Sequence, residues 1–238
     1  MDTFIVVLAL GIFIGFFIQT ILGFGGALVA LPILLYTMSL SEAIAYLSIF
    51  YMLSSIYLMR KEWEYIDKGL LKKMTLSSLI GVGIGILILS FAKPLLLKKA
   101  LGLFIILYVV YKLKSNKSFT LHGNVQFILG LLGGFFSGLF STGGPLYVVV
   151  VNASTPNVHT FRATMFGILA LVTFARIPLL AIGGILETEQ FVYSLQVLPF
   201  FIAALFLGKW AYKLINKVLL SKMIIVVLLI SGIVLLIK

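Results

Sequence analysis

Two arginines lie inside an apolar stretch of the chain, where a charged side chain is costly. Arg162 and Arg176 are 14 residues apart, so an α-helix places them on one face, about 21 Å from each other. A guanidinium group in such a setting binds oxyanions through two parallel hydrogen bonds. The pair indicates a positively charged track for an anion, with Arg162 as its main contact.

A polar break interrupts the apolar sequence shortly before these arginines. The stretch "FSTGGPLY" contains Ser141, Thr142, Gly143 and Gly144, followed by a proline. Hydroxyl side chains before glycines and a proline are typical of a helix N-terminus, with Ser141 and Thr142 as caps. Free N–H groups and the helix dipole at such an end attract anions. The alternative is a tight turn whose glycines serve only close packing.

A second break of the same kind occurs near the amino terminus. The stretch "LGFGGALVALP" contains Gly25 and Gly26, which we expect to open a short helix in the same way. Gln19 and Asn152 flank the two breaks and are candidates to donate to a substrate. Each is equally suited to satisfying backbone groups that the breaks leave unpaired.

Other kinds of site chemistry lack the necessary residues. The chain has no cysteine, two histidines and seven acidic residues, which do not assemble into a metal site or a catalytic triad. We therefore expect neither a cofactor nor an enzymatic activity. Whether His159 or Glu42 carries protons stays open, and the sequence does not define the oligomeric state.

The elements that position these residues belong to a membrane protein. Of the 238 residues, 62% are hydrophobic and 11% charged, and the mean hydropathy is +1.21. No water-soluble domain of this size has such a composition. We predict an all-α, multi-pass protein of the inner cell membrane. Its net charge of +11 comes from lysines and arginines between apolar segments, where they contact lipid headgroups rather than nucleic acid.

The apolar segments follow one another from end to end. A spanning helix needs about 20 residues, so the two short segments are expected to be the second arms of broken, re-entrant hairpins. The predicted segments are 3–22, 26–38, 41–60, 69–91, 94–113, 124–141, 144–153, 158–182, 190–214 and 218–237.

The order of landmarks predicts two repeats. "GFFIQTILGFGG" from Gly15 aligns with "GFFSGLFSTGG" from Gly134. We predict a first repeat at 1–113, a connecting loop at 114–123 and a second repeat at 124–238. Each repeat would consist of a broken hairpin followed by three transmembrane helices.

The lysines and arginines favour an inverted relation between the repeats. The count leaves out Arg162 and Arg176 and covers the other lysines and arginines. If the second repeat is inverted, twelve of them lie on the inner side of the membrane and four on the outer side. Parallel repeats would place nine on the inner side and seven on the outer side. Cytoplasmic loops carry the excess of basic residues. Inverted repeats with paired breaks are typical of secondary transporters, whose substrate site lies at the repeat interface. A passive anion channel is the alternative.

Each arginine also has a structural interpretation. An arginine at the membrane core costs about 2.5–3.5 kcal/mol on insertion scales. Arg162 would avoid this cost by extending its side chain to the inner interface as an orientation signal. Arg176, close to a proline and to the outer end of its helix, has the same alternative.

The chain resembles the TauE/SafE family of membrane transporters over nearly its whole length. The resemblance rests on "GFGGALVALPILL" followed by "SEAIAYLSIFYMLSS", and on "STGGPLYVVVVN" followed by "FRAT". Where the family commonly has a second proline, this chain has Leu146 and Tyr147. The resemblance implies transport of a small sulfur-containing anion, of the sulfite or organosulfonate class, coupled to a proton or sodium gradient.

Overall fold

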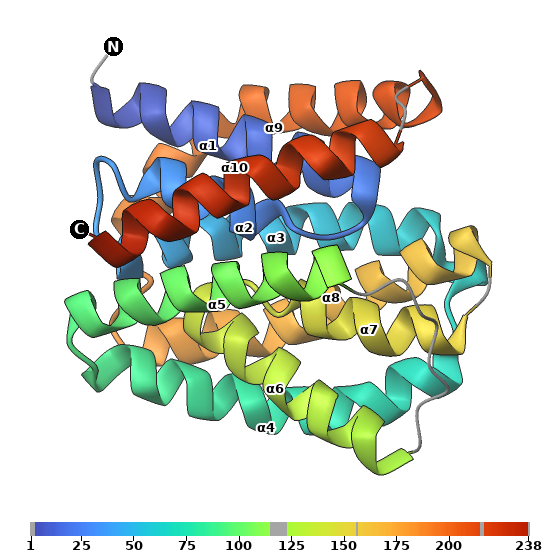
Figure 1. Ribbon diagram of the computed structural model, residues 1–238. Helices are drawn as coiled ribbons and strands as arrows, with labels where there is room; N and C mark the ends of the chain where they lie inside the picture. The colour runs from blue at the N-terminus through green and yellow to red at the C-terminus, as the bar shows by residue number, and fades with distance from the viewer. Residues whose placement is uncertain (1–2, 115–122, 156, 215–216, 238) are drawn as a thin grey trace. The chain divides into compact units, whose positions relative to one another are not determined.

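The computed structural model describes residues 3–114, 123–155, 157–214 and 217–237. Within these ranges the chain forms α-helices and one 3-10 turn, with no strand (Figure 1). Seven of the described helices are long and apolar enough to cross a membrane, which confirms the all-α, multi-pass class. The elements are α1 (Thr3–Leu22), α2 (Gly26–Leu34), α3 (Leu40–Lys61), η1 (Trp63–Tyr65), α4 (Lys68–Phe91), α5 (Pro94–Lys114), α6 (Gly123–Phe140), α7 (Gly144–Ser154), α8 (Val158–Ile182), α9 (Thr188–Leu214) and α10 (Lys217–Ile237).

These helices match the predicted apolar segments one for one. The largest difference is at α2, which ends at Leu34 and not at residue 38. The chain tightens into a turn there, because Tyr36 N–H bonds to the Ile33 carbonyl and Met38 N–H to the Leu34 carbonyl. Residues 115–122 of the predicted connecting loop lie outside the described residues.

The two short helices each fold back on the helix before them. In the first hairpin (α1 and α2), Gly11 lies against Leu34 and Gly15 against Ala30. Later residues of α1 therefore contact earlier residues of α2, so the two arms are antiparallel. In the second hairpin (α6 and α7), Gly133 lies against Tyr147, and Gln126 Nε2 donates to Ser154 Oγ over 3.4 Å. Both breaks are hairpin tips.

Contacts between helices group the chain into two compact units, each with helices from both halves of the sequence. Unit 1 comprises Met1–Ala43, Ala92–Lys117 and Leu195–Lys238, and unit 2 comprises Ile44–Phe91 and Ser118–Ser194. These units do not test the predicted repeats at 1–113 and 124–238, which stay a prediction.

In unit 1, α5 and α10 pack side by side and run in opposite directions (Figure 1, green and red). A Cβ added to Gly102 would lie 2.9 Å from the Gly232 carbonyl oxygen, so the two backbones approach closely at this crossing. On the same unit, α9 packs against the end of α1, where Gly208 faces Phe17 and Thr20.

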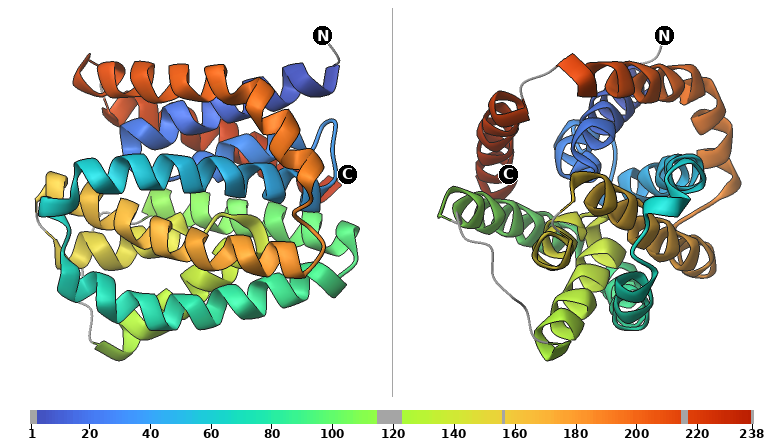
Figure 2. Two further views of the ribbon diagram at one scale, coloured as in Figure 1. Left: turned by 180° about the vertical axis from the view of Figure 1, so that it is seen from behind. Right: turned by 90° about the vertical axis from the view of Figure 1, so that its right-hand side faces the viewer.

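In unit 2, α4 and α6 pack along their lengths and run in the same direction (Figures 1 and 2). Added Cβ atoms at Gly134 and Gly138 would meet the backbone carbonyls of Ser78 and Val82. Small residues allow this backbone approach, which is how helices associate in lipid. The close packing holds α6, and with it the second hairpin, firmly on α4.

Three long helices begin with a side-chain cap. Ser39 and Glu42 form a reciprocal capping box at α3, with Ser39 N–H donating to Glu42 Oε2 over 2.8 Å. Asp67 caps α4 through Leu70 N–H, and Asn157 caps α8 through His159 N–H. The short helices differ, because neither α2 nor α7 has a side-chain cap. Their first N–H groups have no acceptor within the helix.

Candidate functional site

The tip of the second hairpin has a strained backbone. Ser141 has a φ of 59° and is the non-glycine residue with positive φ in the described part of the chain. This left-handed conformation costs about 1–3 kcal/mol and is found where surrounding structure enforces it, often at functional sites. Ser141 and Thr142 are both buried, at 5% and 2% exposure.

The tip is packed too closely for a side chain at Gly143. A Cβ there would meet the Gly133 carbonyl and the hydroxyl of Ser137, both on α6. The ring of Tyr147, one turn into α7, covers Gly133. The glycines therefore bring the N-terminus of α7 directly against the end of α6.

Arg176 of α8 reaches this tip. Its guanidinium Nη1 donates to the Ser137 carbonyl oxygen over 2.9 Å, and the backbone N–H of Ser141 donates to the same oxygen over 2.9 Å. The guanidinium also lies over the ring of Tyr51 of α3, 5.6 Å from its centroid, a favourable cation–π arrangement. Arg176 is thus fixed beside the break, on the last turn of α6.

Most of the donors at the tip have no partner. Arg176 Nε and Nη2 are buried without a hydrogen bond, as are the hydroxyls of Ser141 and Thr142. Nε and Nη2 form one edge of the guanidinium, the edge that presents two parallel N–H groups to an oxyanion. Leaving buried polar groups unpaired costs about 1–3 kcal/mol each, so these donors indicate a ligand.

No acidic side chain balances the charge of Arg176. It is 2% exposed and is the charged residue among the buried side chains of the described ranges. Every described Asp and Glu is at least partly exposed. A buried charge without a counter-ion is strongly unfavourable, and a bound anion would supply that counter-ion.

One sequence expectation for this site was wrong. Ser141 and Thr142 do not cap α7, because the N-cap residue is Gly143 and no side chain bonds to the first turn. The left-handed turn at Ser141 is the reason, since it carries both residues back along the end of α6. Their hydroxyls consequently stay unpartnered.

The tip of the first hairpin holds a different set of groups. Gln19, 1% exposed, lies against Gly26, and its Oε1 has no hydrogen-bond partner. Gly25 is the N-cap residue of α2 with a φ of 87°, and the space around its Cβ position is open. The predicted residues Gln19, Gly25 and Gly26 are therefore together, without a charged group among them.

Arg162 and Asn152 lie away from the tip of the second hairpin. Arg162 is half-buried near the start of α8, with its guanidinium 5.7 Å from the centroid of Phe166. At 1.5 Å per residue, it is about 21 Å along α8 from Arg176. Asn152 is exposed on the last turns of α7, eight residues beyond Gly144, and the carboxylate of Glu42 caps its own helix. The structure brings Arg176, and not Arg162, to the break.

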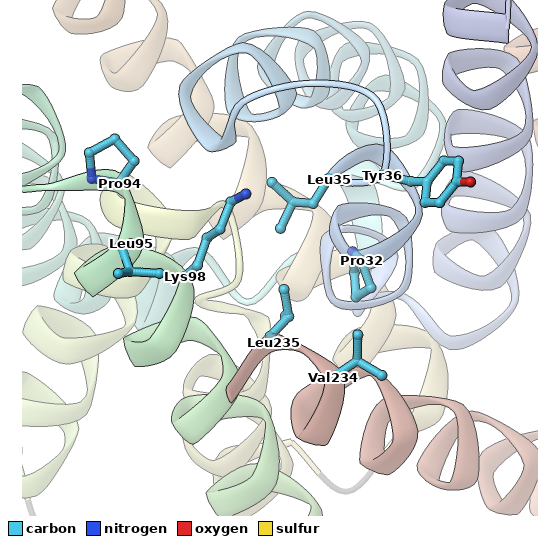
Figure 3. Close-up of a pocket in the computed structure, with 8 residues that line it drawn as sticks. All are labelled: Pro32, Leu35, Tyr36, Pro94, Leu95, Lys98, Val234 and Leu235. Atoms are coloured by element: carbon cyan, nitrogen blue, oxygen red, sulfur yellow. The ribbon is translucent and has the colours of Figure 1, made fainter. Parts of the chain in front are cut away.

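A separate cavity of about 230 Å³ lies within unit 1. Figure 3 shows the ammonium of Lys98 extending toward Leu35, between α5 and the end of α2. The other lining residues are apolar apart from Tyr36, which is 77% exposed. The cavity has none of the buried, unpartnered donors found at the second hairpin. Its lining is Pro32, Leu35, Tyr36, Pro94, Leu95, Lys98, Val234 and Leu235.

Sequence reasoning missed three residues of the site: Ser137, Tyr147 and Tyr51. Ser137 precedes Ser141 by four residues, so helical spacing alone places it one turn below the break. Tyr147 follows the break by one turn, and the sequence marks it only as a departure from a family pattern. Nothing in the sequence pointed to Tyr51, which reaches Arg176 through tertiary packing of α3.

The fold and the site together define an all-helical, multi-pass membrane protein with a buried cationic group at a helix break. The chain belongs to the sulfite exporter TauE/SafE family, whose model matches residues 7–235. It is also similar to a probable membrane transporter protein of Methanocaldococcus jannaschii, with 30% identity over 121 residues. That match covers 47% of this chain and 43% of the archaeal protein, so the chain aligns with less than half of that relative. No solved structure matches the chain.

Proposed function

We propose that this protein is a secondary active transporter of the inner cell membrane for a small sulfur-containing anion, of the sulfite or organosulfonate class. The anion would bind at the tip of the second hairpin. Membership of the sulfite exporter family supports the substrate class, and the geometry of unit 2 supports the location.

The observation that carries the proposal is the free edge of Arg176. The Nη1 bond to Ser137 fixes the guanidinium and leaves Nε and Nη2 unpartnered. An oxyanion on this edge forms two charge-assisted hydrogen bonds. The unpartnered hydroxyls of Ser141 and Thr142, one residue apart on the same tip, are suited to further oxygens of the same anion.

Inverted repeats are part of the proposal, and three features of the fold support them. The order of helices after each hairpin is the same, with three long helices in each half. The first helix of each hairpin packs against the fourth helix of the other half, α6 on α4 and α1 on α9. The last helices, α5 and α10, run antiparallel, as an inversion requires and a parallel repeat does not.

Coupling to a proton or sodium gradient distinguishes this proposal from a passive anion channel. Paired hairpin tips favour the transporter, because broken helices at the centre of inverted repeats are typical of alternating access. Whether one site lies between both tips, at the repeat interface, stays a prediction from the sequence. The role of Gln19 and Asn152 in substrate binding stays a prediction in the same way.

Flux measurements in proteoliposomes test the function. We expect sulfite or methanesulfonate uptake to saturate with concentration and to respond to an imposed proton or sodium gradient. The Arg176→Gln protein should need at least about tenfold more substrate to reach the same uptake. Lys98→Gln, in the separate cavity, is the matched control and should transport normally.

Two outcomes would contradict the proposal in different ways. Flux that never saturates and ignores both gradients would identify a channel. Saturable flux that is unchanged in the Arg176→Gln protein would keep the transporter and remove the site from the second hairpin.

A further inference from the structure

The charges around the second hairpin are unusually simple. The tip holds one buried positive charge, on Arg176, and no buried carboxylate occurs in the described ranges. The six acidic residues that the structure describes are all partly or fully exposed: Glu42, Glu62, Glu64, Asp67, Glu187 and Glu189. Charge balance in this site therefore depends on the ligand alone.

Helix dipoles do not add a second positive charge. The N-terminus of α7 carries a partial positive charge, and the C-terminus of α6 carries a partial negative charge of similar size. The hairpin brings these two ends together, since Ser137 and Gly143 are in contact. Their effects largely offset each other, and the net charge of the tip stays close to that of one guanidinium.

From this charge balance we infer that the second hairpin selects a singly charged oxyanion and rejects a doubly charged one. The inference rests on the proposed function and specifies its substrate class. A monoanion neutralises Arg176. A dianion of the same shape leaves one negative charge without a partner in a buried site, where an uncompensated charge is strongly unfavourable.

The donors at the tip also match the shape of such an anion. Four buried atoms lack partners: Arg176 Nε and Nη2, and the hydroxyl oxygens of Ser141 and Thr142. A carboxylate would occupy the guanidinium edge with its two oxygens and leave the hydroxyls unused. A sulfonate or hydrogen sulfite has a third oxygen for them. Sulfonates and hydrogen sulfite are thus accepted, whereas sulfate and the sulfite dianion are excluded.

The test compares two probes of the same shape, methanesulfonate and methylphosphonate. Methanesulfonate is a monoanion throughout, whereas methylphosphonate gains its second charge as the pH rises past its second ionisation. Binding of each probe to the full-length protein in lipid nanodiscs is measured by calorimetry on both sides of that pH. We expect methanesulfonate to bind equally at both, and methylphosphonate to bind at least about tenfold more weakly once it is doubly charged.

Variants separate charge from geometry. Arg176→Lys keeps one positive charge but loses the planar edge, so its affinity should fall while the preference for the monoanion remains. Arg176→Gln removes the charge and should weaken methanesulfonate binding by at least about tenfold. Lys98→Gln, outside the site, should behave as the unmodified protein. Monodispersity of each variant in the nanodisc before titration shows that it is folded.

The possible results separate a failure of the charge selection from a failure of the proposed anion site. If the dianion binds as well as methanesulfonate, the charge selection is wrong while the anion site stands. If neither probe binds the unmodified protein at either pH, the anion site at the second hairpin is itself wrong, and the inference fails with it.

Discussion

The two hairpins share a backbone design but differ in their chemistry. Each is an antiparallel pair of helices whose short second arm begins at glycine without a side-chain cap. At the first tip the unpartnered group on α1 is the neutral amide of Gln19, whereas the second tip has Arg176 and two free hydroxyls, of Ser141 and Thr142. Helix N-termini alone provide only about 0.3–1 kcal/mol of preference for an anion. This charge difference is the reason that we propose anion binding at the second hairpin and not at the first.

The comparison also shows how a buried charge can be retained in the membrane. Arg176 is fixed by a carbonyl on one side and by an aromatic ring on the other, and neither neutralises it. Its Nε and Nη2 have no hydrogen-bond partner. The first hairpin has no such charged group, and its unpartnered atom is the amide oxygen of Gln19.

Removing the charge is the largest change that can be made to the second hairpin. Arg176→Gln should lower anion affinity by about 10- to 150-fold, because a charge-assisted hydrogen bond contributes about 1.5–3 kcal/mol. Isothermal titration with methanesulfonate measures the loss, and the same titration on Lys98→Gln is the control. Affinity within about twofold of the unmodified protein would show that the hairpins do not differ in the way described here.

Substitution of the glycine at each tip should lower stability, but for a different reason at each. Gly143→Ala places a Cβ against Gly133 and Ser137 and should cost about 1–3 kcal/mol of stability through overpacking. Gly25→Ala has open space but a positive φ, which costs about 1–2 kcal/mol.

Asparagine separates the two causes. Asn tolerates the left-handed conformation, so Gly25→Asn should recover part of the loss, whereas Gly143→Asn should be worse than Gly143→Ala. Thermal unfolding in detergent, followed by circular dichroism, gives the order of the four variants. If asparagine instead restored stability at position 143 and not at position 25, backbone strain would belong to Gly143 and crowding to Gly25.

Much of this fold was predictable because it depends on local composition. Apolar length defined the spanning helices, and the paired glycine breaks predicted both hairpins. The choice between Arg162 and Arg176 was not predictable, since both lie on one face of α8 and the sequence does not say which turn faces the tip of α6. Tyr51 belongs to a helix more than a hundred residues away, and only tertiary packing brings it to the guanidinium. The predicted caps failed because Ser141 adopts a left-handed conformation that sequence patterns do not reveal.

The free hydroxyls should have moderate effects. Ser141→Ala removes one neutral donor and should weaken methanesulfonate binding by about 0.5–1.5 kcal/mol, or roughly two- to tenfold. Thr173→Ala is the matched control, because that hydroxyl already bonds to the Leu169 carbonyl of its own helix over 2.7 Å. Equal losses in the two variants would indicate a general effect of buried hydroxyls, and Ser141 would then have no place in the site.

The smallest effect is expected at the other arginine of α8, and it tests how far the site extends. Arg162 is half-buried about 21 Å from Arg176, a setting in which a long side chain reaches the interface by its flexible stem. Lysine can do the same, so Arg162→Lys should change the Michaelis constant for sulfite uptake less than about threefold. Arg176→Lys should raise that constant at least about tenfold, because lysine lacks the planar pair of donors. Equal losses at both positions would mean that the anion contacts both arginines on its path, and the binding chemistry would then extend along α8 beyond the second hairpin.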